Sequence, residues 1–217
     1  MLYLYPLKFY NIISGGFLIL KQKTRKLSVR LTIRNICYIS LFAAAIAVCA
    51  QIIIPMPAVP FTLQTFAVPL AGIILGAKKG TLAVLVYILL GMTGVPVFAG
   101  FRGGFGVIFG ATGGFILSFP VMALIAGIFS DLQNKFKLKL KNIRLRILFL
   151  ACGLILGAGL NYICGLLFFC YITSRSLGEA FALCVTPFLL PDTLKIILAG
   201  GIGVSVRNIL VRNKILD

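Results

Sequence analysis

Long apolar runs separated by short basic segments make up most of the chain. Residues 35–77 contain no charged side chain, and further apolar runs follow at about 80–97, 111–129, 147–171 and 181–206. A bilayer core about 30 Å thick is crossed by about 20 apolar residues in a helix. The pattern therefore predicts several membrane-spanning helices.

The first apolar run is too long for one helix, and prolines divide it. Pro55, Pro57 and Pro60 fall near its middle, where each removes a backbone donor and stiffens the chain. We expect one helix before this turn and another after it, the second ending at Lys78 and Lys79. The expected spans are about 35–54, 62–77, 80–97, 111–129, 147–171 and 181–206. The predicted fold class is all-α, a polytopic membrane bundle of six transmembrane helices over residues 32–214.

Composition excludes most soluble classes of protein. Hydrophobic residues make up 60% of the 217 residues and charged residues 12%, with a mean hydropathy of +1.10. A soluble domain has roughly 25% charged residues. An ordinary soluble enzyme, a disordered chain and a disulfide-stapled secreted domain are therefore excluded. The net charge of +17 lies in clusters between the apolar runs, which is typical of membrane proteins and disfavours nucleic-acid binding.

The basic residues also predict an orientation. If both termini are cytoplasmic, 18 of the 21 Lys and Arg residues lie on the cytoplasmic side, only Arg102 and Arg175 lie outside, and Lys195 is within the membrane. Positive loops stay on the cytoplasmic side, so we expect this topology, with a glycine-rich outer loop after the third helix. Residues 1–31 are a basic extension whose apolar part is too short to span. We expect it to be interfacial or disordered.

Asp192 is the acidic residue that lies well inside an apolar run, and Lys195 follows three residues later. A charge at such a depth costs roughly 2.5–3.5 kcal/mol on insertion scales, and residues at i and i+3 share a helix face. The pair either locks the last helix or forms a polar ligand site. We favour the ligand site, because Pro187 and Pro191 interrupt the same run and irregular backbone at depth lines cavities or lies buried in protein.

The glycine-rich segment 91–114 is a second candidate feature, with Arg102 as its only charge. A guanidinium group can bind a carboxylate with two hydrogen bonds. The segment is either a flexible outer loop or a loop that folds over a ligand, and apolar residues such as Val97 and Phe98 favour the second interpretation.

Two further features each leave two interpretations open. Thr62, Gln64 and Thr65 follow the proline-rich turn, where Thr62 can cap a helix or Gln64 can offer its amide to a ligand. Ala43 and Ala47 form a small-residue stripe on the first helix. Such a stripe suits close packing of another helix, which belongs either to this chain or to a partner.

Catalytic and metal sites are not expected. The chain has no His, which removes the commonest general base and metal ligand, and it has no Walker A motif. None of its six cysteines forms a CxxC pair. Three GxxxG pairs, Gly72/Gly76, Gly110/Gly114 and Gly153/Gly157, favour close packing of helices within the bundle.

Three segments together resemble the BioY family, the biotin-specific substrate-binding S components of energy-coupling factor transporters. They are VPFTLQTFAVPLAGIILGAKKG (59–80), GMTGVPVFAGFRGGFGVIFGATGGFILSF (91–119) and PDTLK (191–195). The resemblance covers about residues 30–210. The chain differs in having Pro191 where the family more often has Gly and Ala111 where Pro is usual.

The resemblance implies a non-enzymatic transport subunit with biotin as its ligand and no cofactor. It also implies six helices in the cytoplasmic (inner) membrane, a loop after the third helix that covers the site, and three partners: a membrane coupling protein and two ATPase subunits.

The resemblance further assigns roles to residues of this chain. Asp192 and Lys195 would bind the ureido ring, and Arg102 the valerate carboxylate. The other implied residues are the pocket groups Tyr87, Asn161, Gln64 and Thr65, the ring-packing residues Val97, Phe98 and Gly100, and the partner-docking residues Ala43 and Ala47.

The sequence also permits other functions. The chain could be an S component for another small vitamin, or a solitary carrier that works without ATPases. It could also be a membrane enzyme that uses Asp192 or a structural membrane subunit.

Overall fold

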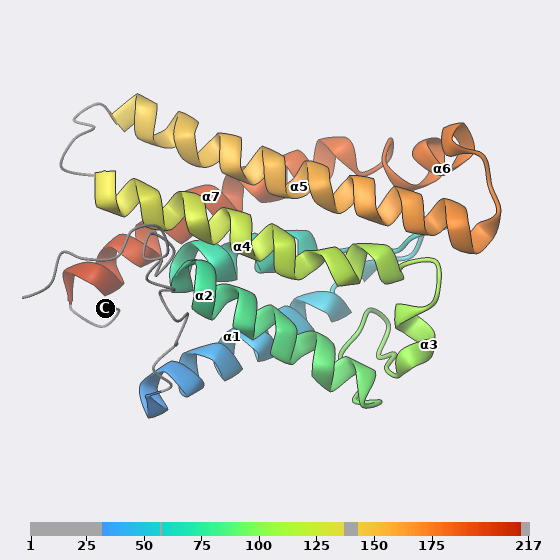
Figure 1. The fold of residues 1–217 in the computed structure, drawn as a ribbon, viewed down its shortest axis with the longest axis horizontal. Helices are drawn as coiled ribbons and strands as arrows, with labels where there is room; N and C mark the ends of the chain where they lie inside the picture. The colour runs from blue at the N-terminus through green and yellow to red at the C-terminus, as the bar shows by residue number, and fades with distance from the viewer. Residues whose placement is uncertain (1–31, 57, 137–142, 214–217) are drawn as a thin grey trace, which may run out of the picture. The chain divides into compact units, whose positions relative to one another are not determined.

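The computed structural model describes residues 32–56, 58–136 and 143–213. Most of these residues are helical (Figure 1). The described elements are α1 (Ile33–Gln51), β1 (Ile53–Ile54), β2 (Phe61–Thr62), α2 (Gln64–Met92), α3 (Phe105–Ile108), α4 (Gly113–Phe136), α5 (Ile143–Thr173), α6 (Leu177–Cys184) and α7 (Leu189–Arg212). Residues 1–31, expected to form an interfacial or disordered extension, lie outside the described residues.

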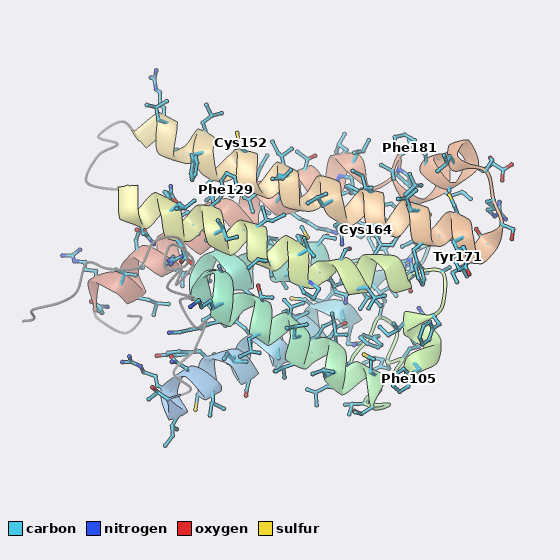
Figure 2. All side chains as sticks on the ribbon, in the orientation of Figure 1. Phe105, Phe129, Cys152, Cys164, Tyr171 and Phe181 are labelled. Atoms are coloured by element: carbon cyan, nitrogen blue, oxygen red, sulfur yellow. The ribbon has the colours of Figure 1, made fainter. Side chains whose placement is uncertain are left out.

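Five of the described helices, α1, α2, α4, α5 and α7, are long and apolar enough to cross a membrane. Their outer faces and the segments that join them carry large apolar side chains, among them Tyr171, Phe105 and Phe181, which are 82%, 57% and 48% exposed (Figure 2). A soluble protein of this size does not expose so much contiguous apolar surface. The chain is therefore a multi-pass membrane protein.

Helix α2 is divided at Gly76, which has φ of 82° and ψ of 171°. Only glycine adopts this conformation without strain. The two halves fold back on each other, since a Cβ at Gly80 would lie 2.6 Å from the Cα of Gly72. The expected boundary at Lys78 and Lys79 was therefore two residues too late, and the second half ends at Met92 rather than at 97.

The last expected span, 181–206, is two helices in the structure. Helix α6 ends at Cys184, and α7 begins at Leu189 after a turn. Pro187 lies in the turn, and Pro191 lies in the first turn of α7, where a missing backbone donor costs nothing. The prolines thus end one helix and start the next.

The mostly helical fold agrees with the all-α prediction, and the proline-rich turn adds one short pair of strands. Strands β1 and β2 pair antiparallel, with Ile53 opposite Thr62 and Ile54 opposite Phe61. Pro55 and Pro60 lie between the strands and exclude a helix there. The flanking backbone groups satisfy each other by pairing, which brings Phe61 and Thr62 beside the start of α2.

The packing of the bundle depends on glycines. Helix α4 lies between α2 and α5 (Figure 1). A Cβ at Gly72 would lie 2.3 Å from the carbonyl oxygen of Ala123, and one at Gly153 would lie 2.3 Å from the ring of Phe129. The prediction that these glycines serve packing within the bundle is confirmed.

A polar cluster joins α4, α7 and the break in α2. Arg207 forms an ion pair with Asp131 and donates hydrogen bonds to Ser130 (2.6 Å) and to the carbonyl of Ile73 (2.9 Å). Asp131 in turn accepts the backbone N–H of Ala77 at 3.0 Å. The cluster satisfies backbone groups that the break at Gly76 leaves free.

Candidate ligand-binding site

Asp192 and Lys195 form a buried ion pair at the start of α7. Their side chains are 7% and 8% exposed, and Lys195 Nζ lies 2.8 Å from Asp192 Oδ1. Asp192 is in the first turn of α7, where the helix dipole stabilises a carboxylate. The prediction that the two residues share a helix face is confirmed.

Three other elements complete the hydrogen bonds of this pair. Thr65 donates to Asp192 Oδ1 at 2.9 Å, and Tyr162 donates to Asp192 Oδ2 at 2.7 Å. Lys195 donates to the carbonyl of Thr62 at 2.6 Å and to Thr65 at 3.1 Å. The carboxylate of Asp192 is thus surrounded by hydrogen-bond donors and the ammonium of Lys195 by acceptors, which offsets the cost of burying the two charges.

Two aromatic rings form an apolar wall beside the pair. Lys195 Nζ lies 3.3 Å from the centre of the Phe61 ring, and Phe61 stacks on Phe188 with centroids 6.0 Å apart. An ammonium group over a ring face is attracted by the ring's negative face. The β1–β2 pairing, which places Phe61, therefore also positions Lys195.

Gln64 lies at the start of α2, directly before Thr65, which binds the Asp192–Lys195 pair. It donates to the hydroxyl of Tyr87 at 2.6 Å, and Thr62 donates to its Oε1 at 3.0 Å. Tyr87 is 1% exposed and packs edge-on against Phe98, with ring centroids 5.6 Å apart. Tyr87 thus fixes the orientation of the Gln64 amide from behind.

Asn161 is buried on α5 and is held by α4. Its Nδ2 donates to the carbonyl of Phe115 at 3.0 Å and to Ser118 Oγ at 2.7 Å. These bonds leave its carbonyl oxygen as the group available to a ligand.

The glycine-rich segment after α2 forms a loop that carries Arg102 and is held by hydrogen bonds. Phe98 and Arg102 form an isolated β-bridge, and Arg102 Nε donates to the carbonyl of Ala99 at 3.1 Å. Gln51, at the end of α1, donates to the carbonyls of Val97 and Phe98 and accepts the N–H of Phe101. The loop is therefore tied to α1 by one side chain.

A cavity lies among these elements. Six of the ten predicted ligand-binding residues line it: Gln64, Thr65, Arg102, Asn161, Asp192 and Lys195. The other four do not: Tyr87 and Phe98 are buried in the hydrophobic core, Val97 packs against that core, and Gly100 lines a neighbouring cavity. The structure thus brings together most of the predicted polar groups and leaves the expected ring-packing residues outside the lining of this cavity.

Sequence reasoning missed the aromatic residues Phe61, Tyr162 and Phe188 among the other residues that line the cavity. Tyr162 follows Asn161 directly, and Phe61 precedes Thr62. The clue in the sequence was that each lies next to a residue already considered as a candidate. For Phe188 the sequence offered no clue except its position between Pro187 and Pro191.

Ala43 and Ala47 lie on the inner side of α1. Ala43 is 3% exposed and belongs to the hydrophobic core, and Ala47 is half-buried against the same core. At Ala43 the stripe packs against this chain's own helices, and docking of a partner on Ala43 and Ala47 stays a prediction.

The charges of the site differ along the cavity. At its base the Asp192–Lys195 pair is neutral as a whole and offers both a donor and acceptors. Arg102 is exposed, and within the described residues it has no acidic partner. The arrangement can therefore bind a neutral group with both donors and acceptors at the base and an anionic group near Arg102.

The fold and the cavity together define a class: an integral membrane protein whose helices enclose a cavity that contains buried polar groups. A model of the BioY family matches residues 22–212, and the chain belongs to that family.

Relatives of known name match most of the chain. The "Probable biotin transporter BioY" of Pyrococcus horikoshii is 38% identical over 75% of this chain and 89% of the relative. The "Biotin transporter BioY" of Thermotoga maritima is 35% identical over 81% of this chain and 97% of the relative.

One solved structure shares the fold. It is the crystal structure of the S-component for biotin from an ECF-type ABC transporter, with a TM-score of 0.70, 22% identity, and coverage of 84% of this chain and 95% of that one.

Proposed function

We propose that the chain is the biotin-binding subunit of a vitamin uptake transporter. The observation that carries the proposal is the buried Asp192–Lys195 pair, which lines one cavity together with the exposed Arg102. A cyclic urea presents two N–H donors and one carbonyl acceptor, and valerate presents a carboxylate. The Asp192–Lys195 pair offers an acceptor and a donor that match the cyclic urea. Arg102 offers donors that match the carboxylate. The names of the relatives from Pyrococcus horikoshii and Thermotoga maritima support the same ligand.

The pair and its neighbours take the ureido ring in this proposal. Asp192 accepts the ring N–H groups, and Lys195 donates to the ring carbonyl. Both groups already bind internal partners, so the ring replaces the hydrogen bonds that Thr65 makes to them, while Tyr162 holds the Asp192 carboxylate in position. Gln64 and Asn161 supply further polar contacts from the cavity wall.

The other end of the ligand lies under the loop. Arg102 binds the carboxylate, and Tyr87 and Phe98 act from behind by supporting Gln64 and the loop. Val97 and Gly100 shape the loop segment that closes over the ring system. Gln51 holds this segment through the carbonyls of Val97 and Phe98.

The membrane arrangement is part of the same proposal. With the two halves of α2 counted separately, the bundle has six spans, in a domain over residues 32–214 after an N-terminal extension over 1–31. Both termini lie in the cytoplasm, because this orientation keeps 18 of 21 basic residues on that side. The glycine-rich loop and the cavity then face the outside of the cytoplasmic membrane.

Transport energy comes from partners in this proposal. A membrane coupling protein and two ATPase subunits assemble with the chain, which is not itself an enzyme and carries no cofactor. The solved structure that shares this fold is an S-component from an ECF-type ABC transporter, which supports such an assembly. Docking of the coupling protein is proposed on the stripe of Ala43 and Ala47, and because Ala43 is buried, it requires α1 to shift.

A competition assay tests the ligand. Purified, ligand-depleted protein is loaded with labelled biotin and challenged with unlabelled biotin or with other vitamins such as riboflavin and thiamine. Displacement by biotin alone is expected. Displacement by another vitamin at equal or lower concentration would overturn the biotin assignment, and uptake of biotin into liposomes by the chain alone would favour a solitary carrier.

A further inference from the structure

A second cavity lies directly outside the first. The two cavities share five lining residues: Pro60, Ala99, Arg102, Val107 and Thr112. These residues form the boundary between an inner cavity, which holds the Asp192–Lys195 pair, and an outer cavity. The guanidinium-bearing residue Arg102 belongs to both.

The outer cavity is much the larger of the two. Its volume is about 390 Å³, against about 60 Å³ for the inner cavity. A bicyclic ring with a valerate chain exceeds the inner cavity, so biotin itself takes part of the outer cavity, and its carboxylate at Arg102 leaves the rest unfilled. The space therefore exceeds what the end of a free acid requires.

The outer cavity has apolar walls from two sides. Strand β1 and the turn that follows it contribute Ile53, Pro55, Met56 and Ala58, and the glycine-rich segment contributes Gly100, Gly106, Gly110 and Ala111. None of these side chains carries a charge or a strong hydrogen-bonding group. Such walls suit a chain of methylene groups rather than a second polar ring.

The order of polar groups fixes which end of a ligand meets this space. The Asp192–Lys195 pair is buried, whereas Arg102 is exposed at the boundary. A ligand with its ureido ring on the pair and its carboxyl carbon at Arg102 therefore directs any substituent on that carbon into the outer cavity.

We propose that the site also binds ureido-ring ligands whose carboxyl carbon is linked through an amide to an alkyl chain, such as biotin joined to the ε-amine of lysine. This inference rests on the proposed function. The Arg102 guanidinium donates to the amide carbonyl as it does to one oxygen of a carboxylate. The methylene groups of the lysine then lie against the apolar walls, removed from water.

Gly106 allows the outer cavity to be filled without touching the inner one. It lines only the outer cavity, its φ is not positive, and a Cβ there would meet no atom within 4 Å. Gly106→Phe therefore has room for its first atoms and takes space from the outer cavity. Phe109→Trp is the matched control, because Phe109 is 66% exposed and lines neither cavity.

The test titrates the purified, ligand-depleted full chain with biotin and with the lysine amide of biotin. We expect the wild type to bind the amide within about tenfold of its affinity for biotin. Gly106→Phe weakens the amide by at least about tenfold and leaves biotin within about threefold of the wild type. Phe109→Trp leaves both affinities unchanged.

The outcomes separate this inference from the proposed function. Failure of both ligands to bind the wild type overturns both. Binding of biotin together with an amide affinity more than about 1,000-fold weaker overturns only the inference. An unchanged amide affinity in Gly106→Phe also overturns it. If Gly106→Phe does not fold, Met56→Trp narrows the same cavity from the opposite wall and gives the same comparison.

Discussion

At the scale of single residues, Asp192 joins α7 to both α2 and α5. Its carboxylate accepts hydrogen bonds from Thr65 and Tyr162 and pairs with Lys195. Asp192→Asn leaves the Lys195 ammonium buried without its counter-charge, and breaking such a pair costs about 2–5 kcal/mol of binding. We expect biotin affinity to fall by at least about 30-fold in equilibrium titration, and Lys195→Ala to do the same.

Glu179→Gln is the control for this charge change. Glu179 is exposed on α6 and lies 3.9 Å from Arg175, a kind of pair that contributes little in water. The Glu179→Gln variant should bind biotin with the affinity of the wild type. Affinities within about threefold of the wild type for both Asp192→Asn and Lys195→Ala would refute the site.

Tyr162 provides a second residue-level prediction. Its hydroxyl donates to Asp192 Oδ2 at 2.7 Å, and a hydrogen bond to a charged group contributes about 1.5–3 kcal/mol. Tyr162→Phe should weaken biotin binding by about tenfold or more, as measured by titration. Tyr171→Phe is the control on the same helix, because Tyr171 is 82% exposed. Equal affinities for the two variants would remove Tyr162 from the site.

The polar residues of the site were more predictable than the aromatic ones. Asp192 and Lys195 are conspicuous because charges in an apolar run are rare. Phe61 and Phe188 are not, since the chain has 18 Phe residues and only the fold shows which rings meet. Tyr87 was assigned to the cavity, yet it acts through Gln64, a distinction that needs three-dimensional contacts.

At the scale of elements, the break in α2 determines how its two halves pack. Gly76 has φ of 82°, and a Cβ there would lie 2.7 Å from Asp131 Oδ1. A non-glycine residue in this conformation costs about 1–3 kcal/mol. Gly76→Ala should therefore lower the thermal unfolding temperature in detergent. Gly178→Ala, on open surface of α6, should not lower it, and an equal loss in both variants would contradict this account of the break.

The connection between α1 and the loop gives a prediction about ligand release. Gln51 donates to the carbonyls of Val97 and Phe98 and accepts the N–H of Phe101. Gln51→Leu removes all of these hydrogen bonds, so we expect faster dissociation of labelled biotin. Gln51→Glu keeps only the acceptor and should give an intermediate rate. A dissociation rate equal to the wild type in Gln51→Leu would show that this side chain does not hold the loop.

Apolar runs and prolines predicted most of the helices, but not their ends. The break in α2 follows the glycine at 76 rather than the charges at 78–79, because backbone conformation decides where a helix bends. The β1–β2 pairing was missed because each strand has two residues, too few for a periodic pattern. The short helix α3 was hidden among glycines for the same reason.

At the scale of the whole molecule, two polar clusters lie far apart in an apolar bundle. Asp192 and Arg207 are both on α7, and 15 residues of helix span about 22 Å. Sites at such a distance usually contribute independently. The cluster around Arg207 joins α7 to Asp131 and Ile73, whereas the cluster around Asp192 lines the cavity.

This separation predicts that substitutions in the Arg207 cluster lower stability, whereas those in the Asp192 cluster lower biotin affinity. Arg207→Met leaves Asp131 and the carbonyl of Ile73 without their partner and should lower the unfolding temperature. The loss stays below the roughly 3–5 kcal/mol of a fully buried pair, because the Asp131 side chain is 35% exposed. Biotin affinity at a temperature where the variant is folded should match the wild type, and a large loss of affinity would show that the clusters are coupled.

Calorimetric titration of the purified, ligand-depleted chain with biotin tests the central claim most directly. The proposed site predicts a saturable isotherm with one biotin bound per chain. Because burial of a ligand changes the heat capacity, the binding enthalpy can pass through zero at only one temperature. The absence of binding heat at several temperatures would contradict the claim that the Asp192–Lys195 cavity is a biotin site.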